Sequence, residues 1–148
     1  MIIRELKETE INSIARIEQK CFSNPWSEDS IKSSFANKAN CFYVAKKDGE
    51  IVGYMGLSVS LDEGYILNVA TLPDYRRQGI AKALINHIIN MYSDKLNFLT
   101  LEVRPSNTAA VKLYEGFGFE QVGERKNYYS NPTENAVLLT LYFIKENI

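Results

Sequence analysis

The chain has 148 residues, of which 45% are hydrophobic and 24% charged, and its formal net charge is -1. This length supports one globular domain over residues 1–148, and the near-neutral charge gives no indication of direct nucleic-acid binding. Its apolar runs are far shorter than the roughly 20 residues of a membrane helix, and the first residues become charged at once, so we expect a cytoplasmic protein that binds no membrane.

Hydrophobic periodicity and turn residues divide the chain into short elements. The predicted elements are strand 2–6, a helix capped by Thr9 and ended by Asn24-Pro25, a short helix capped by Ser27, strands 41–46 and 51–59 around Asp48-Gly49, a turn at 62–64, strand 65–72, helix 83–92, strand 98–103, a helix capped by Asn107, and strands 119–124 and 136–145. Hairpins and crossovers alternate in this order, which predicts a mixed α/β fold. We expect a twisted mixed sheet of about six to seven strands flanked by about four helices.

The chain contains two cysteines and one histidine. Cys21 and Cys41 form no Cys-x-x-Cys pair and are too few for a disulfide framework, so we expect both to be reduced. His87 falls off the apolar stripe of its helix and is expected to face solvent. These residues do not indicate a metal site, and we expect none.

A basic turn at residues 74–82 lies between a predicted strand and a predicted helix. The first N–H groups of a helix have no partner within it, and the helix dipole adds positive potential there, so this end favours an anion. Gly79 has no Cβ to keep phosphate oxygens away, and Arg76, Arg77 and Lys82 add charge. The turn therefore predicts a pyrophosphate site, with a solvated charged loop as the alternative. It has neither a Walker nor a Rossmann glycine pattern.

The pattern Arg76-x-x-Gly79-x-Ala81 resembles the acetyl-CoA-binding motif of the GNAT N-acetyltransferases, and the predicted order of elements is also that of this family. The resemblance implies acetyl-CoA as cosubstrate and a set of coenzyme contacts. These are Val69, Ala70, Thr71, Arg76, Arg77, Gln78, Gly79, Ile80, Ala81, Lys82 and Asn107. Because Ala81 replaces the more usual second glycine, we expect at most a weaker coenzyme affinity.

Four further segments narrow the resemblance within the family. They are Asn-Pro-Trp-Ser at 24–27, Leu-Glu-Val-Arg-Pro-Ser-Asn at 101–107, Leu-Tyr-Glu-Gly-Phe-Gly-Phe at 113–119, and Asn-Tyr-Tyr at 127–129. Together they resemble the bacterial ribosomal-protein-alanine N-acetyltransferases. This branch implies direct transfer of the acetyl group, without a nucleophilic cysteine, to the α-amine of a protein N-terminus. The expected acceptor is a small-subunit ribosomal protein.

Transfer to an α-amine requires only a mild base. A peptide α-amine has a pKa of about 8, so about a tenth of it is neutral at pH 7, whereas a lysine near 10.4 is almost entirely charged. Glu102 lies at the end of a strand whose other face carries Leu101 and Val103. The resemblance makes Glu102 the base. The alternative is a surface carboxylate paired with Arg104 or Lys112.

Five further aromatic and polar candidates follow from the resemblance. Tyr114 is implied as the proton donor to the departing thiolate, and packing on the apolar side of its helix is the alternative. Asn107 is a helix cap that also touches the coenzyme in the resembling proteins. Trp26, with Tyr128 and Tyr129 on a predicted loop, is expected to line the peptide entrance, and simple packing explains these three equally well.

Two other functions stay open from the sequence. An enzyme of the same fold could acetylate a small amine, such as a polyamine, an amino acid or an antibiotic. A non-catalytic module could bind acyl-CoA through the turn at 76–82 alone and either report coenzyme levels or assemble with a partner.

Overall fold

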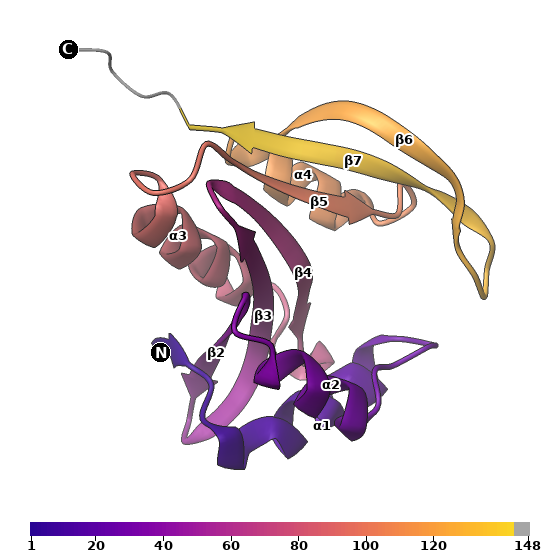
Figure 1. Ribbon diagram of the computed structural model, residues 1–148. Helices are drawn as coiled ribbons and strands as arrows, with labels where there is room; N and C mark the ends of the chain where they lie inside the picture. Colours follow the sequence, from indigo (N-terminus) through magenta and orange to yellow (C-terminus); the bar gives the residue numbers. More distant parts are fainter. Residues whose placement is uncertain (144–148) are drawn as a thin grey trace. The chain divides into compact units, whose positions relative to one another are not determined.

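The computed structural model describes residues 1–143 (Figure 1). The elements are β1 (Ile2–Glu5), the 3-10 helix η1 (Glu8–Glu10), α1 (Ile11–Cys21), α2 (Glu28–Ala36), β2 (Asn40–Lys47), β3 (Glu50–Ser60), β4 (Glu63–Thr71), the 3-10 helix η2 (Pro73–Tyr75), α3 (Ile80–Tyr92), β5 (Phe98–Val103), α4 (Thr108–Gly116), β6 (Glu120–Tyr129) and β7 (Glu134–Tyr142). The mixed α/β class and the predicted order of elements are confirmed. The strand predicted at 136–145 ends at Tyr142, and positions 144 and 145 lie outside the described residues.

The chain divides into two compact units. The first contains Met1–Val59 and Ile66–Met91, and the second contains Ser60–Tyr65 and the chain from Tyr92 onward. Strand β4 begins in the second unit and ends in the first. Along the hydrogen-bonded sheet the strands follow the order β1-β2-β3-β4-β5-β7-β6.

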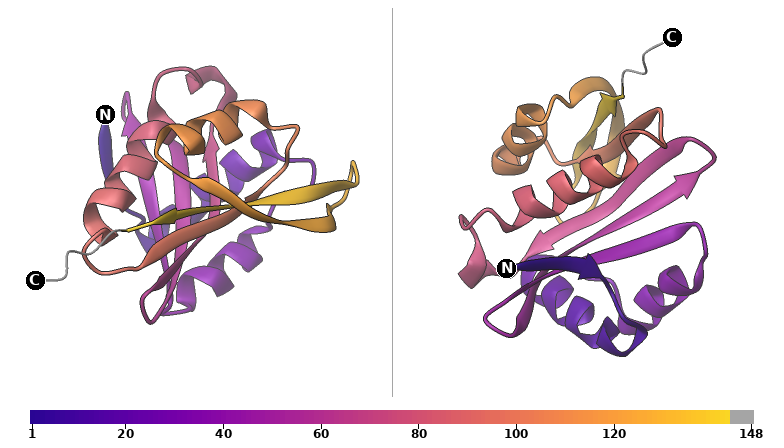
Figure 2. Two further views of the ribbon diagram at one scale, coloured as in Figure 1. Left: turned by 90° about the horizontal axis from the view of Figure 1, so that it is seen from above. Right: turned by 90° about the vertical axis from the view of Figure 1, so that its left-hand side faces the viewer.

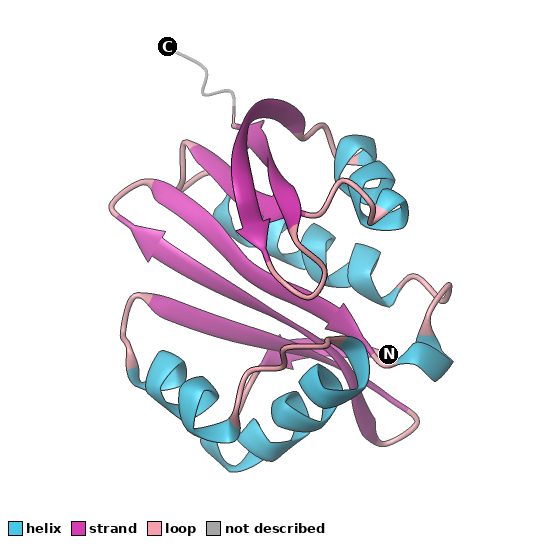
Figure 3. Cartoon of the chain, turned by 90° about the vertical axis from the view of Figure 1, so that its right-hand side faces the viewer, coloured by secondary structure: helices cyan, strands magenta, loops and turns pink. Residues whose placement is uncertain are grey.

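In the first unit, helices cover both faces of the sheet. Strand β2 pairs antiparallel with β1 and with β3. Helices α1 and α2 lie on one face and α3 on the other (Figures 2 and 3). Each helix turns its apolar stripe inward, so that Ile17, Ile31 and Leu84 are fully buried. The sheet and its two helical layers therefore form the core of this unit.

Local signals decide several boundaries in the first unit. The backbone N–H of Ser30 donates to Ser27 Oγ at 3.1 Å, which confirms the predicted cap of α2. Asp48 and Gly49 have φ values of 53° and 76°, which confirms the predicted hairpin turn. The prediction that Thr9 caps a helix is wrong. Thr9 lies inside η1, because the Glu10 carboxylate accepts the backbone N–H of Lys7 at 2.9 Å and the chain enters α1 through a 3-10 turn.

Two other expectations are corrected by packing. Gly64 is not a turn residue: the turn is at Leu61, with a φ of 54°, and Gly64 is buried in β4, where a Cβ would lie 2.6 Å from Leu99 Cδ2. His87 does not simply face solvent. It is half-buried, and its ring centroid lies 5.4 Å from that of Tyr43 on β2. In both cases a neighbouring strand decides the placement: Leu99 of β5 lies against Gly64, and Tyr43 of β2 lies against His87.

The second unit is built around β5. Its first residues pair in parallel with β4, from Glu63↔Phe98 to Tyr65↔Thr100, and its other edge pairs antiparallel with β7, which in turn pairs with β6. Helix α4 lies on one face of this ribbon (Figure 1). The predicted alternation along β5 is confirmed, with Leu99, Leu101 and Val103 buried. Strand β6 extends to Tyr129, so the expectation of a loop at Tyr128 and Tyr129 is wrong.

Gly53 of β3 allows the start of α3 to pack closely. A Cβ at this position would lie 2.7 Å from Ile80 Cγ2 and 3.2 Å from the carbonyl oxygen of Ala70. Ile80 is buried and β-branched, so it has little rotamer freedom to move aside. We expect Gly53→Ala to lower the free energy of unfolding by about 1–3 kcal/mol in urea denaturation.

The matched control for this substitution is Gly116→Ala. Gly116 ends α4, and nothing lies within 4 Å of a Cβ there. Its free energy of unfolding should stay within about 1 kcal/mol of wild type, since alanine favours helix. Equal stability of Gly53→Ala and wild type would show that the contact with Ile80 is not a constraint.

Candidate active site

The predicted coenzyme turn in the first unit joins β4 to α3. Arg77 and Gly79 both have left-handed backbone conformations, with φ values of 63° and 77°. This conformation suits glycine, and a Cβ at Gly79 would meet nothing within 4 Å, so the space in front of the turn is open. Helix α3 begins directly afterwards at Ile80, and its first N–H groups have no intrahelical acceptor. The turn thus has the backbone form of an anion site.

Hydrogen bonds hold this turn against the sheet. Arg76 Nε donates to the carbonyl oxygen of Thr71 at 3.3 Å, and Gln78 Nε2 donates to that of Asp74 at 3.4 Å. Lys47 Nζ donates to Gln78 Oε1 at 2.6 Å. Lys47 therefore adds a cation beside the turn that sequence reasoning missed, because β2 lies about thirty residues earlier and only the fold brings it close.

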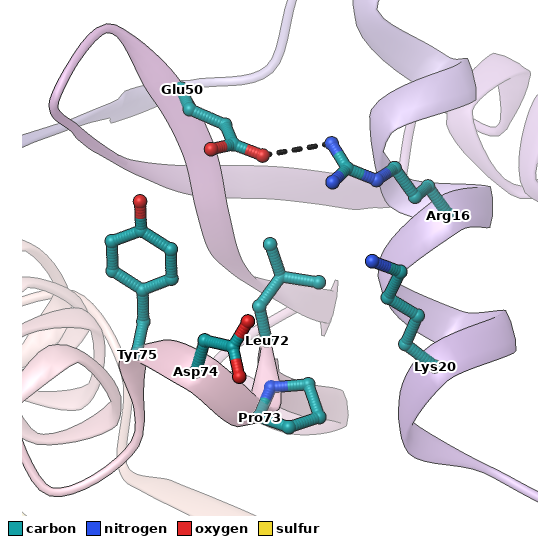
Figure 4. A pocket seen from close by; sticks show the side chains of 7 residues that line it. All are labelled: Arg16, Lys20, Glu50, Leu72, Pro73, Asp74 and Tyr75. Carbon is teal, nitrogen blue, oxygen red and sulfur yellow. Dashed lines mark hydrogen bonds and ion pairs between the residues drawn. The ribbon is translucent and has the colours of Figure 1, made fainter.

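A pocket of about 410 Å³ lies beside the 3-10 helix that precedes this turn (Figure 4). Arg16 and Lys20 of α1 face it from one side, and Arg16 Nη1 is bound to Glu50 Oε1 at 2.8 Å. The remaining lining residues are Leu72, Pro73, Asp74 and Tyr75. Asp74 and Tyr75 belong to the start of the basic turn, but none of the predicted coenzyme contacts and neither Glu102 nor Tyr114 lines this pocket, so we assign it no catalytic role.

Glu102, the predicted base, belongs to the second unit. It lies on the face of β5 opposite Leu101, and its side chain is only 5% exposed. The Tyr65 hydroxyl donates to Glu102 Oε2, and Arg125 Nε donates to Glu102 Oε1 at 3.1 Å. Each Glu102 oxygen receives one of these hydrogen bonds and can accept a second, so an incoming amine still finds an acceptor.

The partners of Glu102 differ from those that the sequence suggested. Arg104 does not pair with it. Arg104 Nη1 instead lies 3.3 Å from Glu134 Oε1 and its guanidinium 4.4 Å from the centre of the Tyr129 ring. Tyr65 was missed, although strand alternation offered a signal: Tyr65 pairs with Thr100, which shares its face of β5 with Glu102.

Tyr114 lies inside the second unit, where it is 6% exposed, and its ring meets that of Phe119 edge-on at 5.3 Å. Burial raises the pKa of its phenol above the ordinary value, and the charge of Tyr129 acts in the same direction. Tyr114 is therefore protonated at neutral pH and can act as a donor. The Asn107 side chain accepts the backbone N–H of Ala110 at 3.2 Å, which confirms it as the cap of α4.

The paired tyrosines of β6 have different environments. Their rings are nearly perpendicular, with centroids 5.0 Å apart, and Tyr128 is 49% exposed. Burial is the largest cause that raises the pKa of Tyr129 to about 12. Charge interactions link Tyr129 with both Tyr114 and Glu102, so these three share one region of the second unit. Trp26 lies in the first unit, half-buried between α1 and α2.

The described residues offer no group of three or more His, Cys, Asp or Glu side chains that could hold a metal ion. Within residues 1–143, no helix combines the length and the apolar character needed to cross a membrane.

Cys21 Sγ donates to the carbonyl oxygen of Thr71 at 3.2 Å, so this thiol packs against the end of β4.

The chain belongs to the Acetyltransferase (GNAT) family, whose model matches residues 11–119, and it is an acetyl-CoA-dependent N-acetyltransferase. The match includes residues of both units. A relative from Escherichia coli (strain K12), named [Ribosomal protein bS18]-alanine N-acetyltransferase, is 35% identical over 142 residues, covering 94% of this chain and 95% of the relative. A protein of the same name from Haemophilus ducreyi is 36% identical, covering 95% and 99%.

A solved structure shows the same fold. The crystal structure of the ribosomal-protein-S18-alanine N-acetyltransferase from Escherichia coli matches with a TM-score of 0.92 at 33% identity, covering 99% of this chain and 96% of that one. The predicted family and fold are therefore confirmed.

The Tyr65 hydroxyl can be tested separately from the carboxylate that it contacts. In Tyr65→Phe, the Glu102 carboxylate still accepts a hydrogen bond from Arg125 but loses the hydroxyl that donates to its other oxygen. We expect kcat for acetyl transfer to fall about tenfold, since small losses of orientation are expensive in rate. Tyr142→Phe, a hydroxyl removal on the exposed end of β7, is the control and should keep the wild-type kcat. Equal rates for all three proteins would remove Tyr65 from the site.

Proposed function

We propose that this enzyme acetylates the N-terminal α-amine of a small-subunit ribosomal protein, the counterpart of bS18. The relatives at 35% and 36% identity carry this acceptor in their names. The observation that carries the proposal is Glu102, a carboxylate 5% exposed that the Tyr65 hydroxyl and the Arg125 guanidinium orient on β5. A positioned carboxylate suits an amine that is partly neutral already. With this acceptor, we also propose that the enzyme acts in the cytoplasm.

Acetyl-CoA is proposed to bind along β4 and the turn after it. The backbone of Val69, Ala70 and Thr71 would follow the pantetheine arm, and the N–H groups of Ile80, Ala81 and Lys82 would receive the pyrophosphate. Support comes from the left-handed turn at Arg77 and Gly79 and from the cations around it. Gln78 and Arg76 brace the turn through their hydrogen bonds, and Asn107 is proposed as a further contact.

The chemistry needs three proton transfers. Glu102 takes a proton from the α-ammonium group, directly or through water, and the neutral nitrogen attacks the thioester carbonyl carbon. The C–N bond forms, the C–S bond breaks, and the Tyr114 hydroxyl gives its proton to the departing sulfur; the second proton that the nitrogen loses as it becomes an amide returns, directly or through water, to the Tyr114 phenolate. The raised pKa of Tyr114 keeps that proton in place until a thiolate appears. Trp26, Tyr128 and Tyr129 are proposed to contact the peptide, as aromatic side chains at binding surfaces do.

The experiment is acetyl transfer to defined acceptors, followed by mass spectrometry of the intact products and their fragments. The acceptors are a peptide with the N-terminal sequence of bS18, the same peptide with a blocked α-amine and an internal lysine, and a panel of small amines. We expect one acetyl group on the α-amine of the first peptide only. Modification of the small amines alone would assign a small-molecule acetyltransferase, and binding of acetyl-CoA without any transfer would assign an acyl-CoA-binding module.

A further inference from the structure

The first unit contains a buried carboxylate that the proposed chemistry does not use. Glu18 of α1 is 1% exposed, although it belongs to a residue type that is almost never fully buried without partners. Burial raises the pKa of its carboxyl group, while hydrogen bonds from Trp26, Tyr54 and Asn68 act in the opposite direction. A buried carboxylate with three polar partners is a specific arrangement, because removing one partner leaves charge uncompensated.

Asn68 connects this carboxylate to β4. Its Nδ2 lies 3.3 Å from Glu18 Oε1, 3.4 Å from Glu18 Oε2 and 3.1 Å from the Tyr54 hydroxyl. These contacts fix which way the amide points. Its Oδ1 then accepts the backbone N–H of Val69 at 3.2 Å. Glu18 is therefore linked through Asn68 to a backbone N–H of the proposed coenzyme strand.

Trp26 connects the same carboxylate to the segment between α1 and α2. The backbone N–H of Trp26 donates a hydrogen bond to Glu18. Glu18 lies three residues before the end of α1, and Trp26 lies just before the cap of α2 at Ser27. One side chain thus holds both the segment that carries Trp26 and the strand position before Val69.

We propose that Glu18 is a positioning residue for acetyl transfer: through its hydrogen bonds it holds the Trp26 segment, on the acceptor side, and through Asn68 it orients the Val69 N–H on the coenzyme side. The proposal rests on the proposed function for the roles of Trp26 and Val69. Glu18 itself touches neither substrate. Its role differs from that of a structural carboxylate, because its loss should affect acceptor binding and turnover rather than stability alone.

The test uses three variants. Glu18→Gln keeps the shape but replaces one accepting oxygen with an N–H₂ group, which can only donate, so one of the two oxygens that now accept from Asn68, Tyr54 and Trp26 is lost. Asn68→Ala breaks the link to Val69 and leaves Glu18 and Trp26 in place; it also serves if Glu18→Gln folds poorly. Glu10→Gln is the matched control, since it removes a carboxylate from the turn that precedes α1, one that is paired with Arg4 at 2.7 Å.

Trp26 is the only tryptophan, so its fluorescence reports on its own segment. In Glu18→Gln we expect stronger acrylamide quenching of Trp26 and an acceptor KM raised about tenfold or more. In Asn68→Ala we expect unchanged quenching and a kcat lowered about tenfold. Glu10→Gln should match wild type in quenching, KM and kcat.

Quenching and kinetics in Glu18→Gln and Asn68→Ala that equal those of Glu10→Gln would overturn the proposal. This result can be distinguished from a failure of the proposed function. A wild-type enzyme that leaves every peptide unmodified contradicts the proposed function, whereas a quenching change in Glu18→Gln supports the hold on the Trp26 segment whatever the acceptor is.

Discussion

Glu102→Gln is expected to lower kcat/KM for N-terminal acetylation by about 10²–10⁴-fold, the range typical of a lost general base. The amide keeps the shape of the side chain and can still accept from Tyr65 or Arg125, but it cannot take a proton from the α-ammonium group. Coenzyme affinity should stay at the wild-type value, because the turn at Arg76 to Lys82 is unaltered. Steady-state rates with the bS18 peptide and calorimetry with CoA measure the two quantities.

The control for this loss is Glu124→Gln. Glu124 is an exposed carboxylate on β6, and it accepts a hydrogen bond from Asn135 Nδ2 at 3.1 Å. Its substitution removes the same charge from the same unit and should leave the rate unchanged. A wild-type rate in Glu102→Gln would mean that water or another group removes the proton, and Glu102 would then be an ion-pair residue only.

Gly79→Glu is expected to abolish measurable CoA binding, with Kd raised at least about 100-fold. The new carboxylate would stand where the N–H groups at the start of α3 are proposed to receive phosphate, and it would compete for them and repel the ligand. The backbone would also carry a side chain at a φ of 77°, which is unfavourable for any residue with a Cβ. Calorimetry with CoA measures the affinity.

Gly49 provides a matched control for the backbone effect. It has a φ of 76°, nothing lies within 4 Å of a Cβ there, and it belongs to a turn of the same unit. Gly49→Glu should therefore lose about the same stability as Gly79→Glu, roughly 1 kcal/mol, with nearly wild-type affinity for CoA. Equal loss of affinity in both variants would show that destabilisation, not the anion site, explains the result.

Predictions from short-range signals were confirmed most often. Ser27 and Asn107 cap their helices, Asp48-Gly49 forms its hairpin turn, and β5 alternates as predicted. Each of these features depends on neighbours within about four positions, which a sequence displays directly. The cap predicted at Thr9 also depends on near neighbours, but this prediction was wrong. The Glu10 carboxylate, which is also bound to Arg4, accepts the Lys7 N–H and forms that turn instead.

The partners within the candidate site could not be predicted in the same way. Tyr65 and Arg125 reach Glu102 from strands 37 and 23 residues away in the chain, and the Glu18 carboxylate meets Asn68 across 50 residues. Such contacts depend on strand order and register, and a shift of one residue would turn every side chain to the opposite face. Gly64 and His87 were misjudged for this reason.

The sequence by itself determined the family, the order of helices and strands and the basic turn, and its motifs made Glu102 and Tyr114 the candidates, because each of these features lies in adjacent residues or in a spacing of a few positions. Only the tertiary structure decided which groups orient Glu102, that Tyr114 is buried and keeps its proton, and that Glu18 holds Trp26 and Asn68 together. Burial and hydrogen bonding are set by residues distant in the chain, and these surroundings give an ionisable side chain its chemistry.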